Sequence, residues 1–175
     1  MMGHSMGGYI TLMFHKLFPE KLLGFSLFHS HPFSDSEETK KKRMREIDFV
    51  KRDKKDLIAK FNIPNAFADN NLNILKDKIQ NSISIALNTE TEGIIANLKA
   101  MMNRPDLSES LAKSNIPFLC IVGKHDNYIN FETVVPTIKL PQTSEFHILE
   151  NSGHMGFIEE EEKSIQIINR FINQL

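Results

Sequence analysis

The pattern that most constrains the fold of this chain is its opening segment, GHSMGG at residues 3–8. It matches G-x-S-x-G, in which a serine is held on a sharp turn between a strand and a helix. Such a turn strains the backbone of Ser5, and side chains at Gly3 and Gly7 are expected to collide with the neighbouring strand and helix. The motif requires a strand before it, although only two methionines precede it. The segment therefore predicts a strand-turn-helix unit with Ser5 at the turn.

Apolar residues elsewhere alternate between helical and strand patterns. Residues 8–18 carry one apolar stripe at helical spacing, and residues 21–30 form a nearly continuous apolar run, as in a strand covered on both faces. Residues 116–122 and 144–149 also read as strands, residues 132–140 as a weak helix interrupted by Pro136, and residues 157–175 as an amphipathic helix. Alternating strands and helices predict an α/β fold with a parallel sheet flanked by helices. We expect a remnant of about three strands.

The middle of the chain differs, because residues 34–105 show helical patterns and no strand pattern. Its first part, residues 35–56, interleaves acidic and basic residues, which favours a solvated helix over a nucleic-acid patch. Loop signals stand at residues 62–64 and 103–105. We therefore predict a core formed by residues 1–33 and 106–175, with a helical cap insertion over residues 34–105.

Composition narrows the class of protein. The single cysteine, Cys120, lies in an apolar run, which predicts a buried thiol and a reducing compartment. No apolar run approaches the roughly 18 residues needed to span a bilayer, and no signal peptide is recognisable. A net charge of −1 favours no polyanion partner. We expect a cytoplasmic protein without nucleic-acid or membrane partners. No metal-ligand spacing, phosphate-binding glycine loop or dinucleotide fingerprint is present, so we expect no metal and no cofactor.

Three candidate catalytic residues stand where strands end. Ser5 lies in the turn, Asp126 follows the strand predicted at residues 116–122, and His154 follows the strand predicted at residues 144–149. Open parallel sheets place their sites at the carboxyl ends of strands. Each residue also has a plainer interpretation: the serine motif occurs by chance, the aspartate suits a turn, and the histidine caps a loop. The order Ser, Asp, His favours the catalytic interpretation.

The chemistry assigns a role to each candidate. A serine hydroxyl is a weak nucleophile until a base takes its proton, and His154 is the candidate base for Ser5. Asp126 would orient the imidazole and stabilise its charged form. The backbone N–H of Met6, at the start of the helix, would supply one oxyanion donor.

At this point three segments resemble a known family: GHSMGGYITLMFHKLFPEKLLGFSLFHS, the GKHD turn, and ENSGHMGFIEEEEKSIQIINRF. They resemble the C-terminal portion of an α/β-hydrolase-fold protein, most closely the bacterial esterases and lactonases. The resemblance implies that Ser5 is the nucleophile, Asp126 the acid and His154 the base. It also implies that the substrate pocket lies close to His4, His29 and Ser30.

The implied activity is cleavage of a small-molecule carboxylic ester, lactone or similar acyl bond through an acyl-serine intermediate, without a cofactor. Such proteins normally have a region before the elbow that supplies further strands and a second oxyanion donor. Its absence here leaves two alternatives open, a catalytically inert fragment and a non-catalytic binding module. It also predicts self-association through an exposed sheet edge. In the cap, Phe49, Phe61 and Phe67 are candidates for contact with an apolar acyl group.

Overall fold

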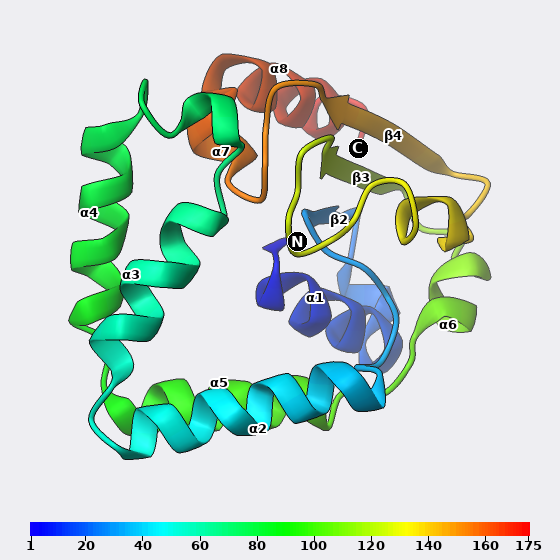
Figure 1. The fold of residues 1–175 in the computed structure, drawn as a ribbon. Helices are drawn as coiled ribbons and strands as arrows, with labels where there is room; N and C mark the ends of the chain where they lie inside the picture. Colours follow the sequence, from blue (N-terminus) through cyan, green and yellow to red (C-terminus); the bar gives the residue numbers. More distant parts are fainter.

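The computed structural model describes residues 1–175. Its centre is one parallel sheet whose strands lie side by side in chain order (Figure 1). The strands are β1 (Met2–His4), β2 (Phe25–Phe28), β3 (Phe118–Gly123) and β4 (Ser144–Leu149). The α/β fold expected from the sequence is therefore present.

The sheet has four strands, one more than the sequence predicts. The strand that the motif requires before Ser5 is β1, which pairs with β2 so that Gly3 lies opposite Leu27. Backbone hydrogen bonds extend this pairing at both ends, from Ser26 N–H to the carbonyl of Met1 (2.9 Å) and from Ser5 N–H to the carbonyl of Phe28 (3.0 Å). A three-residue strand is too short to show a period-two pattern, so pairing with β2, and not the local sequence, defines it.

The chain also forms eight α-helices. Only one of them, α6, lies in a segment for which the sequence showed no pattern. They are α1 (Met6–Leu17), α2 (Glu37–Lys51), α3 (Lys55–Asn65), α4 (Lys76–Leu87), α5 (Thr91–Met102), α6 (Ser108–Ala112), α7 (Gly156–Glu159) and α8 (Glu161–Ile172). None of these helices is both long and apolar enough to cross a bilayer.

Side chains of β3 alternate between two cores. Cys120 and its same-face neighbours pack with Leu12 of α1 and Leu111 of α6. Ile121 points to the opposite face, where it packs with Phe171 of α8. Because both faces are covered, the whole of β3 is buried, which explains its continuous apolar sequence. Burial also raises the pKa of the Cys120 thiol to about 12.

The cap lies to one side of the sheet (Figure 1). Helices α2 and α5 run alongside each other, and α3 and α4 form a second pair. An apolar cluster in the segment predicted as the cap contains Ala66, Phe67, Ile79 and Ile83, and residues beyond β4, Met155 and Ile158, pack against it. Phe67 is fully buried there, whereas Phe49 and Phe61 are exposed. The phenylalanines singled out in the sequence thus have different environments.

Three local predictions were wrong. Helix α3 continues through residues 62–64, because Pro64 stands in its last turn, where the helix ends one residue later. The weak helix expected at residues 132–140 is only a 3₁₀ turn, Val135–Thr137, around Pro136. The predicted C-terminal helix is broken at Glu160, whose backbone is not helical. The carboxylate of Glu160 accepts hydrogen bonds from Asn151 and Ser152 in the preceding loop.

Candidate active site

Ser5 occupies a strained turn between β1 and α1. Its φ is 51°, a left-handed value that few residues other than glycine adopt. Two hydrogen bonds hold this conformation. The N–H of Ser5 donates to the carbonyl of Phe28 (3.0 Å), and the hydroxyl of Ser30 donates to the carbonyl of Ser5 (2.8 Å). Strain of this kind persists only where the surroundings enforce it, and it occurs mostly at functional sites.

The glycines around the turn differ in how much space a side chain would have. A Cβ at Gly3 would lie 2.2 Å from the carbonyl oxygen of Gly7, so this position admits no side chain. A Cβ at Gly8 would lie 2.3 Å from the Oγ of Ser30. Nothing lies within 4 Å of a Cβ at Gly7, so the predicted collision at that position was wrong. The tight contact belongs to Gly8, which faces β2.

Asp126 lies in the loop after β3, and its carboxylate is almost fully buried. Its Oδ1 accepts the backbone N–H groups of Tyr128 (2.8 Å) and Ile129 (2.9 Å). Its Oδ2 lies 2.7 Å from the Nδ1 of His154. The turn chemistry expected of this aspartate and its contact with the histidine therefore coexist, one on each carboxylate oxygen.

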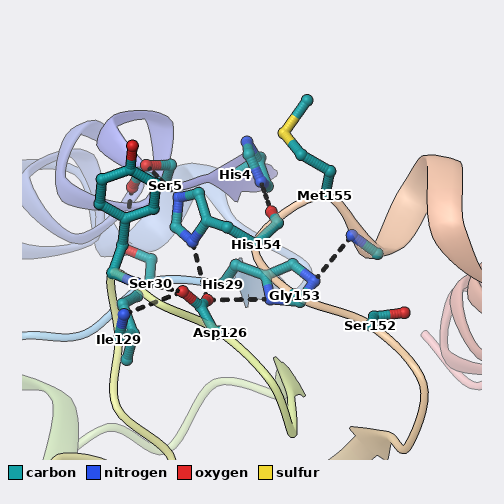
Figure 2. A network of polar contacts seen from close by, with 12 residues as sticks. His4, Ser5, His29, Ser30, Asp126, Ile129, Ser152, Gly153, His154 and Met155 are labelled. Atoms are coloured by element: carbon teal, nitrogen blue, oxygen red, sulfur yellow. Dashed lines mark hydrogen bonds and ion pairs between the residues drawn. The ribbon is translucent and has the colours of Figure 1, made fainter. Parts of the chain in front are cut away.

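His154 joins the acid to the serine. Its Nε2 lies 2.8 Å from the Oγ of Ser5, and its Nδ1 faces Asp126 (Figure 2). The two contacts bridge residues 149 and 28 positions apart in the chain. The backbone N–H of His154 donates to the carbonyl of Ala66 (2.7 Å), so the cap also supports the histidine. The structure brings together the three residues proposed as catalytic.

Burial controls the charges in this site. It raises the pKa of Asp126, but the hydrogen bond with His154 and the neighbouring His29 outweigh it and hold that pKa below its ordinary value. Burial lowers the pKa of His4 to about 4. At neutral pH the carboxylate is therefore ionised and His4 is neutral.

His4, His29 and Ser30 lie around the three candidate catalytic residues, on the inside of the protein. The Nε2 of neutral His4 lies 2.7 Å from the carbonyl of His154, to which it donates. His29 and Ser30 are fully buried, and their contacts are with Asp126 and Ser5. None of the three lines the apolar cavity described below.

One group of side chains has the geometry to hold a metal ion. His29, Asp126 and His154 offer ligand atoms within 4.8 Å of one another. These atoms already contact each other, and a metal would have to displace the proton between Asp126 and His154. The donor set fits a hydrogen-bonded relay better than a coordination site.

An apolar cavity of about 310 Å³ begins beside the turn. Met6, whose backbone N–H is the candidate oxyanion donor, lines it together with Tyr9 of the next helical turn. The guanidinium of Arg104 stacks on the Tyr9 ring at 3.9 Å from its centroid. The remaining lining residues are Ile10, Leu12, Met13, Pro32, Asn97, Ala100, Met101, Asn103, Pro105 and Leu107.

Sequence reasoning missed one residue that shapes the site, Glu159. Its carboxylate accepts backbone N–H groups on both sides of His154, from Gly153 (2.8 Å) and Met155 (3.2 Å). In the sequence, Glu159 belongs to an acidic run that suits a helix N-terminus, and nothing local distinguishes it from its neighbours.

Comparison with known proteins places this geometry in context. The chain aligns with an esterase from Thermogutta terrifontis at a TM-score of 0.92 and 26% identity, over 99% of this chain and 64% of that one. It aligns with the enol-lactonase from Burkholderia xenovorans LB400 at a TM-score of 0.86 and 17% identity, over 98% and 64%. A 2-succinyl-6-hydroxy-2,4-cyclohexadiene-1-carboxylate synthase from Enterobacter sp. (strain 638) is 24% identical over 161 residues, 88% of this chain and 58% of the synthase.

These alignments show a partial α/β-hydrolase fold, and the chain spans less than two thirds of the length of each of these proteins. The family model described as "Ndr family" matches residues 1–174, nearly the whole sequence. The chain therefore belongs to the Ndr family, on a fold that it shares with α/β-hydrolase enzymes.

Proposed function

We propose that this chain is a serine hydrolase that cleaves a carboxylic ester, lactone or similar acyl bond. One observation carries the proposal: a continuous path of hydrogen-bond contacts from Ser5 Oγ through His154 to Asp126, at 2.8 and 2.7 Å. Both distances lie within ordinary hydrogen-bond range, which supports Ser5 as nucleophile, His154 as base and Asp126 as orienting acid.

The geometry supports a two-step acyl transfer. His154 Nε2 takes the proton of Ser5 as Oγ attacks the carbonyl carbon, and Asp126 stabilises the imidazolium that forms. The N–H of Met6 donates to the developing oxyanion. His154 then gives the proton to the leaving alkoxide, which departs and leaves an acyl-serine. Water, deprotonated by the same histidine, releases the acid and restores the hydroxyl of Ser5.

The cavity beside Met6 supports an apolar group on the acyl side of the substrate. Its lining is mostly hydrophobic, and it begins at the residue whose N–H would contact the oxyanion. An acyl chain seated there would place its carbonyl next to Ser5. We therefore expect esters of apolar acids to be better substrates than acetate esters.

Covalent labelling with a serine-directed fluorophosphonate tests the proposal, because it requires an activated serine and no knowledge of the substrate. Intact mass should show one adduct on the wild-type protein and none on Ser5→Ala. Ser84→Ala, which alters an exposed serine on α4, is the matched control and should be labelled like the wild type. A folded wild-type protein without Ser5-dependent labelling would favour the inert fragment or the binding module instead.

A further inference from the structure

His29 is the most enclosed titratable side chain around the triad. It follows β2 directly, is fully buried, and has a φ of 47°, a value in the left-handed region. Its ring occupies space left by two glycines. A Cβ at Gly123 would lie 2.8 Å from the ring carbon Cε1, and a Cβ at Gly156 would lie 2.5 Å from Nε2. The loops after β3 and β4 are thus both shaped around this ring.

The contacts of His29 define its tautomer. The backbone N–H of Gly156 donates to Nε2 at 3.2 Å, so Nε2 is unprotonated and the hydrogen of the neutral ring lies on Nδ1. Burial lowers the pKa of His29, which keeps the ring neutral near pH 7. The tautomer therefore persists across the neutral range.

The Nδ1 of His29 faces the acid of the triad. It lies 3.3 Å from Asp126 Oδ2, the oxygen that His154 approaches at 2.7 Å (Figure 2). This contact is a close approach of charge and not a hydrogen bond, and Nδ1 has no other partner. A buried N–H without a partner is rare, and here it lies beside an ionised carboxylate.

We propose that His29 is a positioning residue that acts on His154 through Asp126. Its Nδ1–H shares the negative charge of the carboxylate with His154. Its Nε2 holds the backbone at Gly156, two residues beyond the base. The ring of His29 thereby fixes Asp126 and the loop that carries His154 relative to each other.

Removing this N–H should shift the protonation equilibrium of His154 in one direction. With one donor fewer, the charge of Asp126 acts more strongly on His154 and favours its protonated form. The other ionisable groups facing His29 are His4, whose ring lies 5.8 Å away, and Glu159. Both of these residues are retained in the His29 variants. The expected effect on catalysis rests on the proposed function, whereas the expected tautomer of His29 follows from its contacts alone.

The first experiment needs no activity. Ring-nitrogen NMR of ¹⁵N-labelled Ser5→Ala protein, assigned by comparison with Ser5→Ala/His29→Gln, should show His29 as the Nδ1–H tautomer. The same ring should titrate at a pH below the ordinary value for histidine. An Nε2–H tautomer, or a ring that is protonated at pH 7, would overturn the proposal.

The second experiment measures the rate of fluorophosphonate labelling against pH for the wild type, His29→Phe and His29→Gln. We expect the acid-side midpoint of His29→Phe to move upward by about half a pH unit or more, as for the loss of one hydrogen bond. Glutamine offers both a donor and an acceptor, so the midpoint of His29→Gln should lie closer to that of the wild type than to that of His29→Phe. Exposed His125→Gln is the control.

A His29→Phe variant that melts earlier but keeps the wild-type midpoint would show a purely structural role. If His29→Phe does not fold, the midpoint of His29→Gln and the tautomer of His29 in the NMR experiment still test the proposal. If the wild type is not labelled at all, the proposed function fails, while the NMR experiment tests His29 independently.

Discussion

The backbone N–H of Ala68 in the cap donates to the Oε2 of Glu159 in the core at 2.7 Å. The other oxygen of this carboxylate accepts the N–H groups of Gly153 and Met155, which flank His154. Asn71 adds a fourth donor at 2.8 Å. Glu159 thus connects the cap to the loop that carries the candidate base.

Replacing Glu159 by alanine should therefore weaken both the fold and the site. Hydrogen bonds to a charged group contribute about 1.5–3 kcal/mol, and partly buried N–H groups would lose their acceptor. We expect Glu159→Ala to lower the free energy of unfolding by about 2 kcal/mol and to slow fluorophosphonate labelling. Urea denaturation and labelling rates measure the two effects. Glu162→Gln, at an exposed position in the same acidic run, should change neither.

Two adjacent glycines offer a sharper contrast. Gly8→Ala brings a methyl group within 2.3 Å of Ser30 Oγ and 2.4 Å of its Cβ, and overpacking of this kind destabilises by about 1–3 kcal/mol. Gly7→Ala meets nothing within 4 Å and exchanges a poor helix former for a good one. We expect Gly8→Ala to melt earlier and to lose labelling of Ser5, while Gly7→Ala melts at or above the wild-type temperature. Equal melting temperatures would contradict the assignment of the tight contact to Gly8.

These glycines also show how far the sequence alone can lead. The motif at residues 3–8 and the strand-like run at residues 116–122 predict the turn, the parallel sheet and the order of the candidate catalytic residues. They do so because strand ends and turns have strong local signatures. The sequence does not indicate which glycine meets Ser30, because that contact crosses from α1 to the end of β2.

Long-range contacts explain the other misses. Glu159 lies 91 positions from Ala68, and nothing near either residue indicates that they meet. β1 is defined by pairing with β2 and not by its own composition. His29 could be predicted near the site, but its contact with Asp126 depends on how β2 and β3 pair.

Stability should fall as the solution becomes acidic, first through histidines. Burial lowers the pKa of His4 and His31 to about 4, against an ordinary value of 6.5. As the pH falls below 6.5, His4 and His31 become protonated in the unfolded chain while they stay neutral in the folded protein. The stability that is present above pH 6.5 is therefore lost progressively between pH 6.5 and 4. Each histidine contributes a slope of about 1.4 kcal/mol per pH unit at most.

Urea denaturation at pH 7.5, 6 and 5 measures this slope. His31→Gln should show a shallower loss than the wild type, and His125→Gln should show the same loss. The pKa values of Asp35 and Asp126 are held below the ordinary value, because their hydrogen-bond partners outweigh burial. Their contributions are therefore retained above pH 4 and lost only at lower pH. An unchanged slope in His31→Gln would contradict the role of this histidine.

The junction between cap and core depends on a buried ion pair. The carboxylate of Asp35 is 2% exposed and lies 2.6 Å from both Arg43 and Arg104. Arg104 also donates to the carbonyl of Phe33 (2.9 Å), so it joins the two chain segments that enter and leave the cap. Without Arg104 the buried carboxylate keeps only Arg43 as a partner, and the bond to Phe33 is lost as well.

Hydrogen bonds to charged groups contribute about 1.5–3 kcal/mol, so we expect Arg104→Ala to lower the free energy of unfolding by about 2 kcal/mol, which urea denaturation would measure. Lys42→Ala removes an ion pair with Glu38 whose side chains are 68% and 80% exposed. Because exposed pairs contribute little, this control should be indistinguishable from the wild type. If both variants lose the same stability, the junction does not depend on the pair.

The last prediction concerns the free edge of β1, through which we propose that copies of the chain associate. β1 ends the sheet on one side, so its outer N–H and C=O groups face no further strand. Leu23, 79% exposed, lies close by, because the amino group of Met1 donates to the carbonyl of Gly24 at 2.9 Å. An unpaired edge beside exposed apolar side chains favours strand-to-strand association.

Sedimentation velocity over a wide range of concentrations should show reversible association of the wild type. Leu23→Lys places a charge beside the edge and should shift the protein toward monomer, since charged side chains block edge pairing. Ile74→Lys is the matched control, because Ile74 is similarly exposed (77%) but lies in the cap. Association that both variants reduce equally would point to general hydrophobicity, and association that neither reduces would point to another surface. Only a selective effect of Leu23→Lys supports the edge of β1 as the interface.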